Sequence, residues 1–149
     1  MMVDRLSSIS NINIKSWHYR IYSFEKLDVY QDALELCVKI YGILVDFPKE
    51  EQFDIVRQIK RAMGSVTANL AEGSGRASGK DQAHFTNMAY ASVLEAINHF
   101  NLALKLQYLS PDTNAQLRLS FDKIINKLNA LYKYQVNSLQ TLKGKMKKN

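Results

Sequence analysis

Residues 58–81, QIKRAMGSVTANLAEGSGRASGKD, restrict the possible folds of this chain more than any other segment. Within it and just before it, apolar side chains recur every three or four residues, which is the spacing of one buried helix face. These positions are Phe53, Val56, Ile59, Met63, Val66 and Leu70. Gly73 and Gly75 predict that the helix ends in the left-handed conformation. Ser78 with Asp81 predicts the capped start of a second helix.

The same periodicity predicts four helices in the chain. They are expected at about residues 27–46, 49–72, 78–108 and 111–139. Only six glycines and two prolines occur, which favours helices over a turn-rich β fold. Four helices with short connections predict an all-α, up-down-up-down antiparallel four-helix bundle. The expected division is a flexible N-terminal extension (1–23), the bundle (24–139) and a basic C-terminal tail (140–149).

The formal net charge is +6, and the excess positive charge lies toward the C-terminus. Residues 111–149 carry eight basic and two acidic side chains, a mild indication of a polyanionic partner. The one cysteine, Cys37, cannot form an internal disulfide, and its place on an apolar helix face predicts a buried, unreactive thiol in a reducing cytoplasm. No apolar run is long enough to cross a bilayer and no signal peptide is evident, so we expect no membrane association.

No residue pattern indicates catalysis. His18, His84 and His99 have no partner at the spacing of metal ligands. Residues 73–76 are rich in glycine, but they follow a helix and lack the Gly-Lys-Ser ending of a phosphate-binding loop. No serine or cysteine has an evident activating base. We therefore expect a protein that is not an enzyme, with no metal and no cofactor.

Polar residues form a stripe along the second predicted helix. Its members are Gln58, Arg61, Ser65, Asn69 and Glu72, with Glu95 on the third helix. In one interpretation, Arg61, Glu72, Glu95 and Arg76 pair with one another and fix helix ends and subunit contacts, because partly buried charges need partners. In the other, basic residues of this region face a polyanion. The first is favoured for Arg61, Glu72 and Glu95, and the choice stays open for Arg57, Lys60, Arg76 and Lys80.

The fourth predicted helix is basic and leads into a basic tail. Its cations are Arg118, Lys123, Lys127 and Lys133, followed by Lys143, Lys145, Lys147 and Lys148. Scattered surface lysines usually serve solubility, but the same side chains bind phosphates without sequence preference. Tyr132 and Tyr134 could stack on bases, although Tyr132 is expected in the core.

The stripe and the turn after it match a known family. The matching positions are Gln58, Arg61, Ser65, Asn69, Glu72, Gly73, Gly75, Arg76, Lys80 and Asp81. This segment resembles the helix-two-to-helix-three junction of small bacterial four-helix bundle proteins encoded within intervening sequences of large-subunit ribosomal RNA genes. The accessory subunit of diversity-generating retroelements shares that fold. Gly64 and Thr67 depart from the pattern, and the looser resemblance covers about residues 24–135.

The resemblance implies a closed ring of five subunits. Tyr30, Tyr41, Phe47, Tyr90 and Tyr108 give more aromatic surface than one bundle core needs, which would suit such interfaces. We therefore expect a non-enzymatic, cytoplasmic homo-oligomer that clamps the phosphates of structured RNA or DNA through basic helix faces. The resemblance also suggests an accessory role beside a partner enzyme such as a reverse transcriptase. The alternative is a protein-interaction scaffold with no nucleic-acid role.

Overall fold

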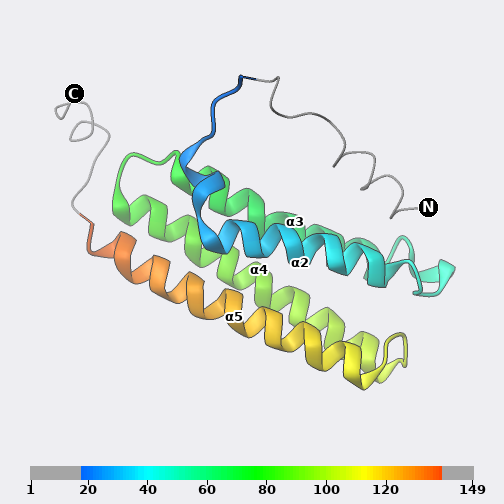
Figure 1. Ribbon diagram of the computed structural model, residues 1–149. Coiled ribbons are helices and arrows are strands. Elements are labelled where there is room, and N and C mark those ends of the chain that lie inside the picture. The colour runs from blue at the N-terminus through cyan, green and yellow to red at the C-terminus, as the bar shows by residue number, and fades with distance from the viewer. Residues whose placement is uncertain (1–17, 139–149) are drawn as a thin grey trace.

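The computed structural model describes residues 18–138, so most of the predicted N-terminal extension and the whole basic tail lie outside the described residues. The elements are η2 (Ser23–Lys26), α2 (Asp28–Leu44), η3 (Lys49–Glu51), α3 (Ile55–Ser74), α4 (Gly79–Lys105) and α5 (Pro111–Val136). No strand occurs within residues 18–138. The predicted all-α four-helix bundle is confirmed (Figure 1).

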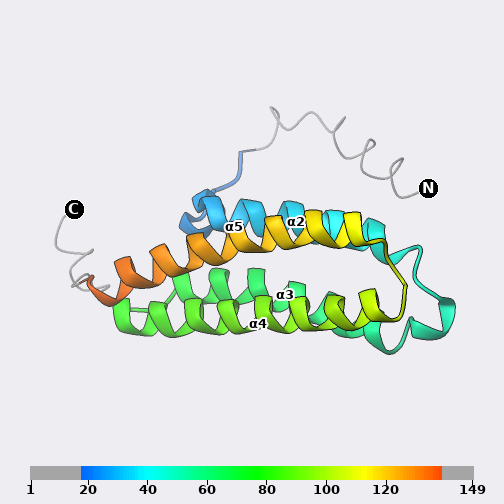
Figure 2. The ribbon, with the colours of Figure 1, turned by 90° about the horizontal axis from the view of Figure 1, so that it is seen from below.

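The four long helices lie side by side, and each runs in the direction opposite to its predecessor (Figure 1). Seen from below, α2 and α5 form one layer and α3 and α4 form the other (Figure 2). Each helix contacts the next one along the chain, and α2 also contacts α5, which closes the bundle. The most extensive contact is between α3 and α4.

Two helix starts are capped by serine side chains, and the first of them is a predicted one. The side-chain oxygen of Ser78 accepts a hydrogen bond from the backbone N–H of Asp81 (3.2 Å), which satisfies one free donor at the start of α4. Ser110 does the same for Thr113 (3.1 Å) at the start of α5, where Pro111 occupies the first helical position.

Within residues 18–138, no helix is long and apolar enough to cross a membrane.

The predicted start of the second helix is wrong. Residues 49–51 form the short 3-10 helix η3, and Asp54 (φ −113°, ψ −108°) interrupts the helical backbone before α3 begins at Ile55. This interruption changes the rotational phase of the chain, so Phe53 is 83% exposed instead of belonging to the core. Ile55 and Val56 are the first buried residues of α3.

Gly73 and Gly79, on either side of the α3–α4 turn, allow close packing and do not adopt a left-handed backbone. No glycine within residues 18–138 has a positive φ, which corrects the expectation for Gly73 and Gly75. A Cβ added to Gly73 would lie 2.7 Å from the Cβ of Phe85 on α4, so the glycine lets the two helices approach. A Cβ on Gly79 would lie within 3 Å of the Gln135 carbonyl oxygen at the end of α5.

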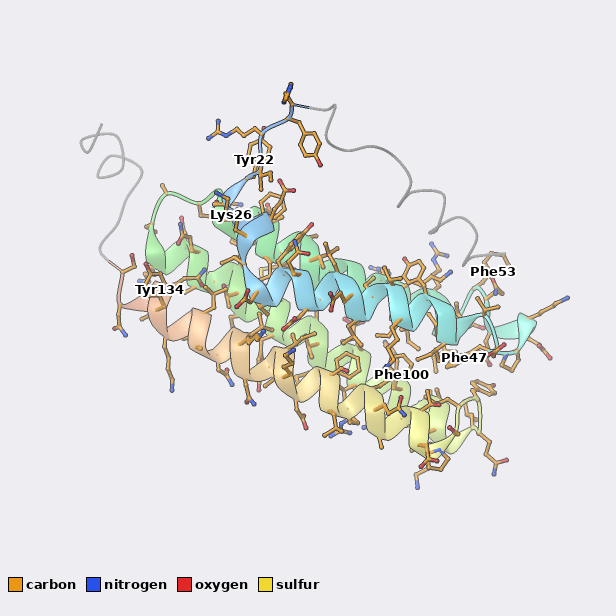
Figure 3. The ribbon with its side chains drawn as sticks, in the orientation of Figure 1. Tyr22, Lys26, Phe47, Phe53, Phe100 and Tyr134 are labelled. Atoms are coloured by element: carbon orange, nitrogen blue, oxygen red, sulfur yellow. The ribbon has the colours of Figure 1, made fainter. Side chains whose placement is uncertain are left out.

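The core draws its fully buried side chains from all four helices. The largest are Ile40, Leu44, Ile59, Met63, Phe100, Leu117, Phe121, Ile124 and Leu128. Phe100 of α4, labelled in Figure 3, meets Phe121 of α5 with ring centres 6.1 Å apart. Tyr132 is 43% exposed and does not belong to this core, because the apolar face of α5 runs through Leu128 and Leu131.

Candidate nucleic-acid interface

The inner part of the predicted polar stripe is a hydrogen-bonded cluster between α3 and α4. Asn69 is only 8% exposed, and its side-chain amide donates to the carbonyl oxygen (2.8 Å) and the hydroxyl (3.0 Å) of Ser65. The hydroxyl of Ser92 on α4 lies 2.9 Å from that of Ser65. Buried polar groups need such partners. Ser65 therefore joins α3 to α4 within one subunit, and Asn69 supports it from the same helix.

The outer part of the stripe does not form one network. The side chains of Gln58 and Arg61 are exposed, and neither side chain makes a hydrogen bond or ion pair with any described residue. Glu72 pairs with Arg76 (3.2 Å), whereas Glu95 lies 3.5 Å from His99. The predicted pairing of Arg61 with Glu72 or Glu95 is thus absent within residues 18–138.

The cations of the α3–α4 turn differ in how firmly they are held. Arg76 bonds to Glu72, and its guanidinium carbon lies 4.4 Å from the ring centre of Phe85. This ion pair and this cation–π contact together hold the guanidinium against the bundle surface. Lys80, in the first turn of α4, is exposed and pairs with no described residue.

A basic cluster lies on one turn of α3. Arg57, Lys60 and Arg61 lie within five residues of each other on that turn, and we call them the α3 cluster. The ammonium of Lys60 lies 4.9 Å from the ring centre of Tyr41 on α2. Arg57 and Arg61 are exposed, and none of the three forms an ion pair with a described carboxylate. Their charges are therefore available to a partner.

Two of the predicted phosphate-binding lysines of α5 contact a carboxylate on α2 instead. The ammonium of Lys127 lies 2.5 Å from Oδ2 of Asp32, and that of Lys123 lies 3.7 Å from the same oxygen. The hydrogen bond to Asp32 raises the pKa of Lys127 above its ordinary value. Asp32 was missed because nothing in the sequence relates it to a residue far along the chain. These lysines link α2 to α5.

The other two predicted cations of α5 lie apart. Arg118 donates a hydrogen bond to the side-chain oxygen of Asn101 on α4 (3.3 Å), whereas Lys133 is exposed and pairs with no described residue. The eight predicted nucleic-acid contacts therefore do not form one surface. Arg57 and Lys60 belong to the α3 cluster, and Arg76, Lys80 and Lys133 lie toward the end of the bundle where α4 begins and α5 ends (Figure 1).

Groups for metal or thiol chemistry are few in the described part of the chain. No set of three His, Cys, Asp or Glu side chains between residues 18 and 138 could hold a metal ion. Cys37 is half-buried, and burial raises the pKa of its thiol. A thiol with a raised pKa is a weak nucleophile at neutral pH.

The aromatic residues expected at subunit interfaces are largely used within the subunit. Phe47 is buried, and its ring centre lies 5.5 Å from that of Tyr108. Tyr108 donates a hydrogen bond to Glu51 (2.9 Å), which raises the pKa of the phenol. Tyr30 and Tyr90 pack against the core. The exposed apolar side chains are mostly aliphatic instead.

Fold and surface together define a small helical-bundle protein with an unpaired cationic patch. Residues 25–130 match the family of 23S rRNA-intervening sequence proteins, and the chain belongs to this family. A crystal structure of a protein of unknown function from the S23 ribosomal protein family of Bacteroides thetaiotaomicron is similar, with a TM-score of 0.65 and 23% identity. The match covers 70% of this chain and 95% of that one, and supports the fold alone. No curated protein matches the chain.

Proposed function

We propose that this protein binds nucleic acid, RNA in particular, through the α3 cluster as a non-enzymatic accessory protein of the cytoplasm. The observation that carries the proposal is the set of three cations on one turn of α3, Arg57, Lys60 and Arg61, that no described carboxylate neutralises. Family membership supports a role connected with RNA. Phosphate contacts of this kind position a nucleic acid without reading its sequence.

A ring of identical subunits would strengthen such binding. The resemblance implies a homopentamer, and each copy would present the same α3 cluster. Several weak contacts made together give an avidity far above that of one subunit. A protein that holds RNA in this way suits an accessory role beside a nucleic-acid enzyme, for example a reverse transcriptase.

The test is binding of labelled RNA and DNA hairpins to the full chain at increasing salt concentration. We expect affinity to fall steeply with salt, because each phosphate contact releases bound counterions. The variant Arg57→Glu with Arg61→Glu should lose most binding. Its matched control is Lys49→Glu with Lys105→Glu, which makes the same charge change at two exposed lysines outside the α3 cluster, one in η3 and one at the last residue of α4. Equal binding by both variants would reject the α3 cluster as the interface.

The rival function is a protein-interaction scaffold, and exposed aliphatic side chains favour it. Leu34 and Val38 on α2 and Met88, Leu94 and Leu102 on α4 are all at least a third exposed. Such residues suit contacts between subunits or with another protein. Native mass spectrometry of the wild type and of Val38→Gln with Leu94→Gln tests one exposed position on each of these two helices. An unchanged oligomer mass, together with hairpin binding by the wild type, would reject the scaffold.

A further inference from the structure

Exposed aromatic and basic side chains gather at one end of the bundle. Tyr19 and Tyr22 precede α2 and are 66% and 55% exposed, and Tyr134 near the end of α5 is 69% exposed. Tyr22, Lys26 and Tyr134 lie toward the same end, opposite the exposed Phe53 (Figure 3). Tyrosine is enriched at interfaces because its ring is apolar and its hydroxyl is polar.

Tyr22 is exposed but held in place. Its ring is stacked on that of Phe24, with ring centres 6.5 Å apart and planes 15° apart, and Phe24 meets Tyr30 of α2 edge-on at 5.0 Å. The backbone N–H of Tyr22 donates to the carboxylate of Glu25 (2.9 Å). The guanidinium carbon of Arg20 lies 5.4 Å from the Tyr22 ring centre. The result is a short stack anchored on α2 that ends in solvent.

A cavity of about 220 Å³ is lined by Tyr134 and by Phe24, the ring on which Tyr22 is stacked. Phe24, Leu27, Leu131 and Tyr134 supply apolar walls, and Gln82 and Gln135 supply polar ones. The amide nitrogen of Gln82 donates to the Arg76 carbonyl oxygen, and the side-chain oxygen of Gln135 accepts from Thr86. The side-chain oxygen of Gln82, an acceptor, and the side-chain nitrogen of Gln135, a donor, thus have no hydrogen-bond partner among residues 18–138.

We infer that this end of the bundle binds an unpaired nucleobase, a conclusion that rests on the proposed nucleic-acid function. A planar ring with donors and acceptors on its edge matches a cavity that has aromatic walls and free amide groups. Arg20, Lys26 and Lys133 are the nearby cations for the adjoining phosphates, and Glu25 is engaged by the Tyr22 backbone. Unpaired bases are required, because bases inside a duplex are already stacked on one another.

The site lies largely on parts of the chain outside the family match. That match covers residues 25–130, so Arg20, Tyr22, Lys133 and Tyr134 all fall beyond it. The α3 cluster lies inside it. The two surfaces therefore have different roles. The α3 cluster contacts the phosphates of a nucleic acid whatever its structure, and the end of the bundle selects RNA or DNA that has unpaired bases. Every base has a π-face, so this selection is tolerant of sequence.

The test compares a single-stranded oligonucleotide of about ten nucleotides with a blunt duplex of the same sequence. The wild type should prefer the single strand. The variant Tyr22→Ala with Tyr134→Ala should lose roughly tenfold or more in affinity for the single strand and keep its affinity for the duplex. Phe53→Ala, an exposed ring at the opposite end, is the matched control and should change neither. Tyr22→Phe with Tyr134→Phe should bind as the wild type does, because stacking needs the ring and not the hydroxyl.

The outcomes separate the two proposals. Wild-type binding to both nucleic acids, reduced by Arg57→Glu with Arg61→Glu but unaffected by Tyr22→Ala with Tyr134→Ala, would overturn the base-binding site and leave the proposed function standing. No binding of either nucleic acid by the wild type at low salt would overturn both. Loss of duplex and single-strand binding alike in the alanine variant would also overturn the base-binding site.

Discussion

Replacing Gly73 by alanine tests the close approach of α3 and α4. In a helix interior, Gly→Ala normally stabilises by about 1 kcal/mol, because the unfolded chain loses freedom. At Gly73 the new Cβ would lie 2.7 Å from the Cβ of Phe85, a carbon attached directly to the backbone of α4. To relieve this clash, the helices must separate locally by a few tenths of an ångström or more. Such overpacking lowers the stability of a protein by about 1–3 kcal/mol. We expect net destabilisation by about 1 kcal/mol.

Gly64 supplies the matched control on the same helix. No atom lies within 4 Å of a Cβ added there, so Gly64→Ala should stabilise by about 1 kcal/mol. The two alanine variants should therefore differ by about 2 kcal/mol, which corresponds to roughly 4–8 °C in Tm for a chain of this size. Thermal unfolding followed by far-UV circular dichroism measures the gap. Equal Tm values for the two variants would refute the argument that Gly73 is needed for helix contact.

Four further changes test other parts of the bundle. Asp32→Asn removes the carboxylate that raises the pKa of Lys127. The stability that this pair gives the folded protein is complete below about pH 10.4 and is lost as the pH rises through the folded-state pKa of Lys127. In urea titrations at alkaline pH, the wild type should therefore lose more stability with rising pH than the variant does. Asn69→Ala should lower the free energy of unfolding by about 1–3 kcal/mol, since it leaves a buried cluster incomplete. Gln107 ends α4 with φ 63°, so Gln107→Gly should stabilise by about 1 kcal/mol in denaturant titration. Phe53→Ser should change the free energy of unfolding by less than about 0.5 kcal/mol.

The sequence was sufficient for the helices because their signals are local. The first helix was expected at residues 27–46 and is Asp28–Leu44, and the start at Ser110 and Pro111 follows from side chains one turn apart. The start of α3 was wrong because periodicity was extended through residues 49–54, where one non-helical residue changes the phase. Phe53 fits an apolar pattern only if the helix is continuous.

The candidate site was less predictable because charge pairing is not local. The sequence locates Lys123 and Lys127 on one face of a helix, but the rotation of α5 against α2 decides whether that face meets Asp32 or solvent. The same holds for Arg61, whose expected carboxylate partners form other contacts. Helical spacing defines which residues share a face, and it does not define what that face contacts.

Pairing also decides which charge reversals are informative about binding. Glutamate at positions 123 and 127 would put three carboxylates together between α2 and α5, because Asp32 lies within 4 Å of both lysines. Like charges at that distance repel, so lost RNA retention in such a variant would not separate a damaged bundle from a missing contact. Arg57 and Arg61 contact no described carboxylate, and their reversal changes the surface without breaking an ion pair within residues 18–138. The α3 cluster is therefore where loss of binding can be assigned to the interface itself.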